Sequence, residues 1–132
     1  MGVVRAQLPT LEEAAALGAA LVEVDAALLR HPPGGRRRWL TGGEPYLNVS
    51  IEDDERGLSF VEARFRGRFV RRSRGGALAT GESDELEVAQ PMPASKVERL
   101  TAARTEVLDV VRALLSARGL HEEARWLLDG AG

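Results

Sequence analysis

Apolar and polar residues alternate along the middle of the chain, as they do in a strand of an antiparallel sheet. In the stretch 60–72, the side predicted to face a core carries Val61, Ala63, Phe65 and Phe69. The opposite side, predicted to face water, carries Glu62, Arg64, Arg66 and Arg68. Because a sheet with one buried face needs this alternation, we predict that residues 60–72 form its central strand.

A second alternating segment, residues 46–52, precedes this stretch and places Val49 and two other apolar residues on one side. The acidic segment 53–57 ends in glycine and is typical of a hairpin loop. If Glu52 lies opposite Leu58, Val49 faces Val61 and both apolar sets share one face. The two segments therefore predict a β-hairpin.

A third strand is predicted within residues 75–90, after a Gly-Gly turn. Its inward residues are Leu86 and Val88, and its register brings Glu85 near Arg64 on the outside. Gly67, inside the central strand, is interpreted as a β-bulge that shifts the alternation of the residues after it.

Helical periodicity begins near the N-terminus. Thr10 and Glu13 have the spacing of a capping box, and apolar residues then recur at helical intervals as far as Leu28. The His-Pro-Pro sequence at 31–33 ends this helix. Gly18 lies on its apolar side, where the missing side chain either admits another backbone or is a tolerated defect.

A second helical pattern occupies the C-terminal quarter of the chain. A capping box at Ser95 and Glu98 opens a helix that is predicted to run to about Arg118. Gly119 followed by leucine is typical of a Schellman C-cap, and residues 121–129 predict a short final helix.

Together these elements predict an α+β fold in the order α-β-β-β-α-α. An antiparallel sheet of three or four strands would carry the long N- and C-terminal helices on one face. A length of 132 residues with 44% apolar residues is ordinary for one core, so residues 1–132 are interpreted as a single α+β domain.

Two charged residues interrupt the apolar faces of the predicted helices. Asp25 falls on the apolar side of the first helix, and Arg104 falls on that of the second. Because a lone buried charge is costly, antiparallel packing of these helices predicts a structural ion pair between Asp25 and Arg104. Arg104 reaching along its neighbours to water is the alternative.

The charges of the chain nearly cancel, to a formal net charge of −2, but they are segregated. Residues 64–74 contain no acid, whereas residues 82–87 contain no base. Lys96 is the only lysine, and the arginine- and alanine-rich composition is typical of a GC-rich bacterium. No apolar run is long enough to span a bilayer and Glu12 interrupts any secretion signal, so a cytoplasmic protein without membrane contact is predicted.

The sequence motifs that resemble catalytic ones each lack a required residue. The segment 121–125, His-Glu-Glu-Ala-Arg, resembles a zinc-protease helix, but Arg125 stands where the second histidine is required. The chain has no cysteine and only two histidines, which leaves few acid–base groups and no thiolate ligands. We therefore predict a protein that is not an enzyme and that binds neither metal nor cofactor.

The arginine-rich side of the central strand is the candidate binding surface. The predicted partner-binding residues are Arg36, Arg37, Arg38, Tyr46, Arg64, Arg66, Arg68 and Arg72. The function predicted from them is a non-enzymatic protein-binding module of the inhibitor, immunity, chaperone or adaptor type, with an acidic protein partner. Nucleic-acid binding through the same residues is the alternative. Self-association, or an ordinary solvated face neutralised by nearby glutamates, also remains open.

Overall fold

The computed structural model describes residues 7–83 and 98–130. Within these residues the chain forms one antiparallel sheet of seven strands in the order β1 to β7, so that each strand pairs with its neighbours in sequence. The prediction of an α+β protein with an antiparallel sheet is confirmed. The predicted three or four strands, the order α-β-β-β-α-α and the long N-terminal helix are wrong.

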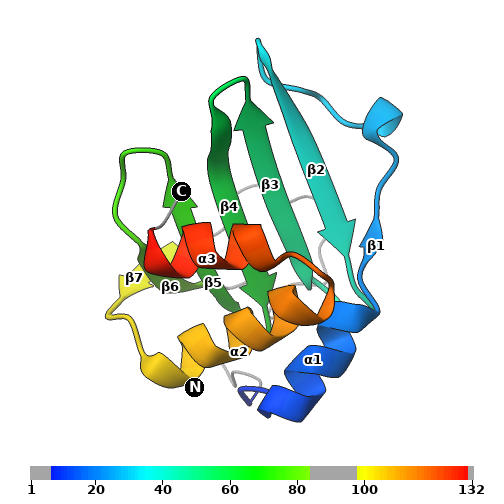
Figure 1. Cartoon of the computed structure of the whole chain (residues 1–132). Helices are drawn as coiled ribbons and strands as arrows, with labels where there is room; N and C mark the ends of the chain where they lie inside the picture. Colours follow the sequence, from blue (N-terminus) through cyan, green and yellow to red (C-terminus); the bar gives the residue numbers. More distant parts are fainter. Residues whose placement is uncertain (1–6, 84–97, 131–132) are drawn as a thin grey trace.

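The strands are β1 Val22–Glu23, β2 Gly35–Thr41, β3 Asn48–Asp54, β4 Gly57–Phe65, β5 Arg68–Ser73, β6 Ala79–Ser83 and β7 Glu98–Thr101. The helices are α1 Leu11–Ala19, the 3₁₀ helix η1 Ala26–Leu28, α2 Thr105–Ala117 and α3 His121–Asp129. All three α-helices lie on the same side of the sheet (Figure 1).

The predicted central strand is in fact a hairpin made of β4 and β5. Arg66 and Gly67 both have positive φ, 47° and 75°, and Phe65 pairs with Arg68 across them. Positive φ at both central residues is the mark of a type I′ turn, which joins antiparallel strands tightly. Gly67 is therefore a turn residue and not a bulge. Because the turn has two residues, odd-numbered positions lie on one face of the sheet before it and on the opposite face after it.

The predicted β3–β4 hairpin is confirmed, but its register differs by two residues. Val49 pairs with Ala63 and Ile51 with Val61, and an irregularity follows between Glu52 and Asp53. Because side chains alternate with a period of two, this shift leaves the same apolar residues on the buried face.

The N-terminal helix begins as predicted and ends early. The reciprocal Thr10–Glu13 capping box is present, but α1 stops at Ala19. Val22 then pairs with Thr41, and the Val24 N–H donates to the Trp39 carbonyl at 2.8 Å. Pairing of these β-branched residues with β2 outweighs the helical periodicity of the sequence.

Of the two interpretations of Gly18, the close approach of another backbone is the one that the structure supports. A Cβ atom at this position would lie 1.9 Å from the carbonyl oxygen of Leu114 in α2. The absent side chain therefore lets the backbones of α1 and α2 meet directly.

The C-terminal helix begins later than predicted. Residues from Glu98 to Thr101 form β7, and Ser95 lies outside the described residues, as do the predicted strand residues Glu85, Leu86 and Val88. The predicted Schellman cap is confirmed, because the Leu120 N–H donates to the Leu115 carbonyl and Gly119 has a φ of 82°. The final helix has the predicted bounds.

The core lies between the sheet and the helices. It combines the inward residues of the central strands with one side of each α-helix, and its largest fully buried members include Leu40, Ile51, Phe65, Leu114, Leu115 and Leu127. We call this side of the sheet the helix face and the opposite side the outer face.

Candidate binding surfaces

The predicted row of arginines does not lie on one face. Arg64 pairs with Phe69 across the β4–β5 hairpin, so both belong to the outer face. Arg72 pairs with the core residue Val61, which places Arg72 on the helix face together with Arg68, four residues earlier in β5. The row predicted from alternation is therefore wrong, because the turn at Arg66 divides it between the two faces.

Arg64 is buried in a cluster of charged side chains on the outer face. We call Glu62, Arg64, Phe69, Arg71 and Glu98 the Phe69 cluster. The Arg64 Nε donates to Glu62 Oε1 at 2.9 Å, and Arg64 Nη2 donates to Glu98. Arg71 Nη1 donates to Glu98 at 3.1 Å and Glu62 at 3.3 Å.

Phe69 forms the apolar centre of this cluster. Its side chain is fully buried, and the guanidinium carbons of Arg64 and Arg71 lie 5.3 Å and 4.5 Å from the ring centroid. Both distances are within the range of cation–π attraction. Burial opposes the ionisation of Glu98, but hydrogen bonds from Arg64 and Arg71 outweigh it and hold the pKa of this carboxyl below its ordinary value. Arg64, at 7% exposure, is thus a structural residue.

The other three predicted arginines of this region also bind groups of the chain. Arg66 donates to both oxygens of Glu44, at 2.7 and 3.1 Å, and to the Gln7 carbonyl at 3.0 Å. Arg72 Nε donates to the Leu127 carbonyl at 2.9 Å and so fastens the end of α3 to β5. Arg68 Nη1 donates to the Arg66 carbonyl at 3.2 Å.

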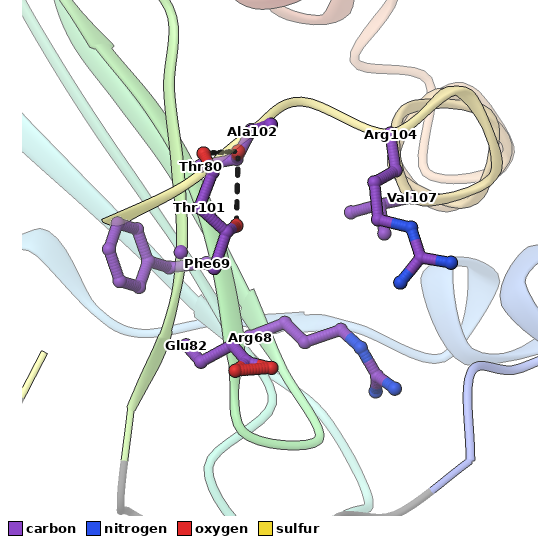
Figure 2. Close-up of a pocket in the computed structure, with 9 residues that line it drawn as sticks. Arg68, Phe69, Thr80, Glu82, Thr101, Ala102, Arg104 and Val107 are labelled. Carbon is purple, nitrogen blue, oxygen red and sulfur yellow. Dashed lines mark hydrogen bonds between the residues drawn. The ribbon is translucent and has the colours of Figure 1, made fainter. Parts of the chain in front are cut away.

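Arg68 lines a small pocket of about 90 Å³ between β6, β7 and the beginning of α2. Thr80 forms one wall, where its hydroxyl donates to the Thr101 carbonyl at 2.9 Å. Figure 2 shows the guanidinium groups of Arg68 and Arg104 extending toward the same side of this pocket. The Thr80 hydroxyl in its wall is thus already hydrogen-bonded within the chain.

The basic residues of β2 are paired in the same way. The salt bridges, with N–O distances of 3.0, 3.0 and 2.8 Å, are Arg36–Asp53, Arg37–Glu52 and Arg38–Glu23. The hydrogen bond from Arg38 lowers the pKa of Glu23 below its ordinary value. Since β1 and β3 supply these carboxylates across the sheet, the predicted basic segment carries little uncompensated charge.

Tyr46 does not lie in the strand predicted for it. It has a φ of 64° in the connection between β2 and β3, and its side chain is 40% exposed. Its side chain therefore does not belong to either face of the sheet, and its role in partner binding stays a prediction.

The predicted ion pair between Asp25 and Arg104 is wrong. Asp25 lies beyond α1 and caps η1, accepting the Ala27 N–H at 2.9 Å. Arg104 precedes the first turn of α2, and its largely exposed side chain lies 3.5 Å from Glu106. Neither residue lies on a buried helix surface, because both helices are shorter than the periodicity of the sequence indicated.

An apolar patch on the outer face was missed by sequence analysis. Trp39 is 39% exposed and lies opposite the half-buried Val24, while Val22, one step along β1, is 66% exposed. We call Val22, Val24 and Trp39 the Trp39 patch. Val22 and Val24 lie in the segment that had been assigned to the N-terminal helix. Alternation over 35–41 was the available signal, but three consecutive arginines obscured it.

A groove on the helix side of the molecule was also missed. It has a volume of about 410 Å³, and its lining is Arg56, Gly57, Leu58, Arg74, Glu122, Arg125 and Trp126. We call it the Trp126 groove. Because its walls come from the β3–β4 turn, the beginning of β4, the residue after β5 and α3, only the fold brings these residues together.

The chain matches no protein-family model, no curated protein and no solved structure. Among the helices that the structure describes, none is long and apolar enough to cross a membrane. Residues 7–83 and 98–130 contain no group of three or more His, Asp or Glu side chains placed to hold a metal ion.

Proposed function

We propose that this protein is a non-enzymatic protein-binding module whose partner docks on the Trp39 patch. The observation that carries the proposal is the exposure of large apolar side chains on adjacent strands, whereas most other large apolar residues in 7–83 and 98–130 enter the core. Exposed apolar residues that form a contiguous patch are typical of interaction surfaces.

The backbone under this patch is rigid. Trp39 lies in the middle of β2, which pairs with β1 on one side and β3 on the other. Its indole is therefore presented at little conformational cost, and tryptophan is among the residues that contribute most binding energy at interfaces.

Arg37 gives the patch a polar rim. It lies two residues from Trp39 on the same face, and its side chain is 40% exposed while it binds Glu52. A carboxylate of an acidic partner would meet this guanidinium at the edge of the patch. The proposed partner therefore has an apolar centre with acidic residues beside it.

The arginines of the sheet support nucleic-acid binding less well than they support a protein partner. The arginines assigned to phosphate contacts in β2 and β4 already bind carboxylates of the chain. An unbroken row of uncompensated cations, which phosphate binding requires, is not found among the described residues.

The test is affinity capture from the native host with two matched variants. Trp39→Ala should abolish capture of the partner, whereas Leu100→Ala should leave it unchanged. Leu100 is the control because it is 72% exposed on the same face but lies in β7, at the opposite edge of the sheet. A partner that is captured equally by the wild type and Trp39→Ala would overturn the proposal.

A further inference from the structure

The Trp126 groove is lined by one arginine that forms a salt bridge and by two that form none among the described residues. Arg74 donates to both oxygens of Asp54 at 2.8 Å and to the carbonyls of Gly57 and Leu58 at 2.9 and 3.0 Å. These contacts hold its guanidinium in place and compensate its charge. The hydrogen bonds from Arg74, followed by that from the Arg56 N–H, lower the pKa of Asp54 to about 2.

The guanidinium groups of Arg56 and Arg125 are not held in this way. Across the described chain, neither guanidinium has a hydrogen bond or salt bridge to another residue, although both line the groove. The nearest carboxylates attract them electrostatically but form their salt bridges with other arginines: Asp54 with Arg74, and Asp129 with Arg112, each at 2.8 Å. Glu122 is the one carboxylate of the lining that the structure describes.

The floor between these cations is apolar and fixed. Leu58 and Trp126 are half-buried and pack against the core, so each is anchored on one side and open to the groove on the other. Charged groups beside a rigid aromatic ring are the usual composition of a site that recognises one side chain and its charged neighbours.

We propose that the Trp126 groove is a second binding site, for an acidic protein segment. An apolar side chain of the segment rests on Trp126 and Leu58, while aspartate or glutamate residues on either side of it bind Arg56 and Arg125. Charge complementarity supports this occupant, because the unpaired groups of the lining are mainly cationic. The proposal is independent of the Trp39 patch, which lies on the other face.

A peptide fits this groove better than a nucleic acid does. Glu122 in the lining can accept a backbone N–H of a peptide, a donor that a phosphodiester backbone does not have. Two uncompensated arginines also match two carboxylates near one apolar side chain, whereas a nucleic acid needs cations repeated along its length.

The test uses a fluorescein-labelled peptide that contains one leucine between two pairs of glutamates. The protein carries Trp39→Phe, so that Trp126 is its only tryptophan and reports on the groove directly. We expect the peptide to raise the anisotropy and change the Trp126 emission in parallel, with weaker binding at high salt. No binding at millimolar protein would overturn the proposal.

Matched variants locate the site. Arg125→Glu and Arg56→Glu should each weaken peptide binding by about fivefold or more, because each removes an ion pair of up to about 1 kcal/mol and adds a repulsion between like charges. Arg30→Glu makes the same change of charge at another exposed arginine that does not line the groove and should leave binding unchanged. Equal weakening by Arg30→Glu would mean a non-specific charge effect and would overturn the assignment.

Two further measurements test the chemistry of the occupant. Trp126→Ala should reduce binding of the leucine peptide but should not affect a peptide in which the leucine is replaced by glycine. A single-stranded oligonucleotide should bind more weakly than the acidic peptide. Tighter binding of the oligonucleotide, or no effect of Trp126→Ala, would contradict an acidic protein segment as the ligand.

Discussion

The Phe69 cluster and the Trp126 groove are built from the same kinds of residue and have opposite properties. Each places arginines near an aromatic ring, two in the cluster and three in the groove. In the cluster, Glu62 and Glu98 bind both arginines and the ring is fully buried. In the groove, Arg56 and Arg125 have no such partners among the described residues, and the indole stays partly open.

The difference shows that the position of the carboxylates, and not the number of arginines, decides where a basic surface arises. Glu62 pairs with Arg71 across the β4–β5 hairpin, and β7 brings Glu98 from a distant part of the chain. Arg56 and Arg125 lie in a turn and on the exposed side of α3, and the nearest strand carboxylate, Asp54, forms its salt bridge with Arg74 instead.

The largest expected effect is the loss of Arg64. Arg64→Ala should lower the free energy of unfolding by about 3 kcal/mol, because it leaves Glu62 buried with only the longer contact to Arg71. Urea unfolding followed by circular dichroism measures this change. The double variant Glu62→Gln with Arg64→Met should cost less than Arg64→Ala alone, and an equal or larger loss would contradict the ion-pair explanation.

A smaller loss is expected for Glu98→Gln. The substitution keeps the shape of the side chain but removes the charge that binds Arg64 and Arg71, so we expect a decrease of about 1.5 kcal/mol. Because Glu62 still binds both arginines, the effect should be smaller than that of Arg64→Ala. If the order of the two variants is reversed, Glu98 and not Glu62 is the main anion of the cluster.

Acid should weaken the salt bridge between Arg74 and Asp54 in the groove. The pKa of Asp54 is about 2 in the folded state, below its usual value of about 3.9. Its contribution to stability is therefore complete above about pH 4 and is lost as the pH falls toward about 2. Unfolding of the wild type and Asp54→Asn at pH 5, 4, 3 and 2 should give a difference that shrinks across this window. A constant difference would show that Asp54 is not ionically bound to Arg74.

The smallest effect is expected where arginines have no partner. Arg56→Ala and Arg125→Ala should each change the free energy of unfolding by less than about 0.5 kcal/mol, as is usual for exposed side chains without contacts. Differential scanning calorimetry is suited to such small changes. A loss of 1 kcal/mol or more at either position would mean that the groove arginines are structural, like those of the Phe69 cluster.

The sequence predicts local features of this fold well and long-range features poorly. The Thr10 capping box, the Gly119 cap and the bounds of α3 depend on residues within a few positions of each other, and all three are confirmed. The end of α1 depends on pairing of Val22 and Val24 with a distant strand, which no local pattern indicates. Tertiary pairing overrides helical propensity there.

The candidate surfaces follow the same rule. Alternation placed Arg64 on the outer face correctly, but the burial of Arg64 depends on Glu98 from β7. The division of the arginine row depends on one turn, where Arg66 adopts a positive φ that an arginine rarely shows. The Trp126 groove joins the predicted hairpin around residues 53–58, the predicted Gly-Gly turn and the predicted short final helix.

The direct contact between Gly18 and Leu114 has a consequence for the order of folding. Each strand of the sheet finds its partner next along the chain, so pairing within the sheet closes mostly short loops. Docking of α1 on α2 instead brings together helices that are far apart in the sequence. The contact between them stabilises the protein only once the two backbones have met. We therefore expect α1 to dock after the transition state, so that Gly18→Ala speeds unfolding and leaves the refolding rate nearly unchanged. A slower refolding rate in stopped-flow measurements would instead place the contact between α1 and α2 within the folding nucleus.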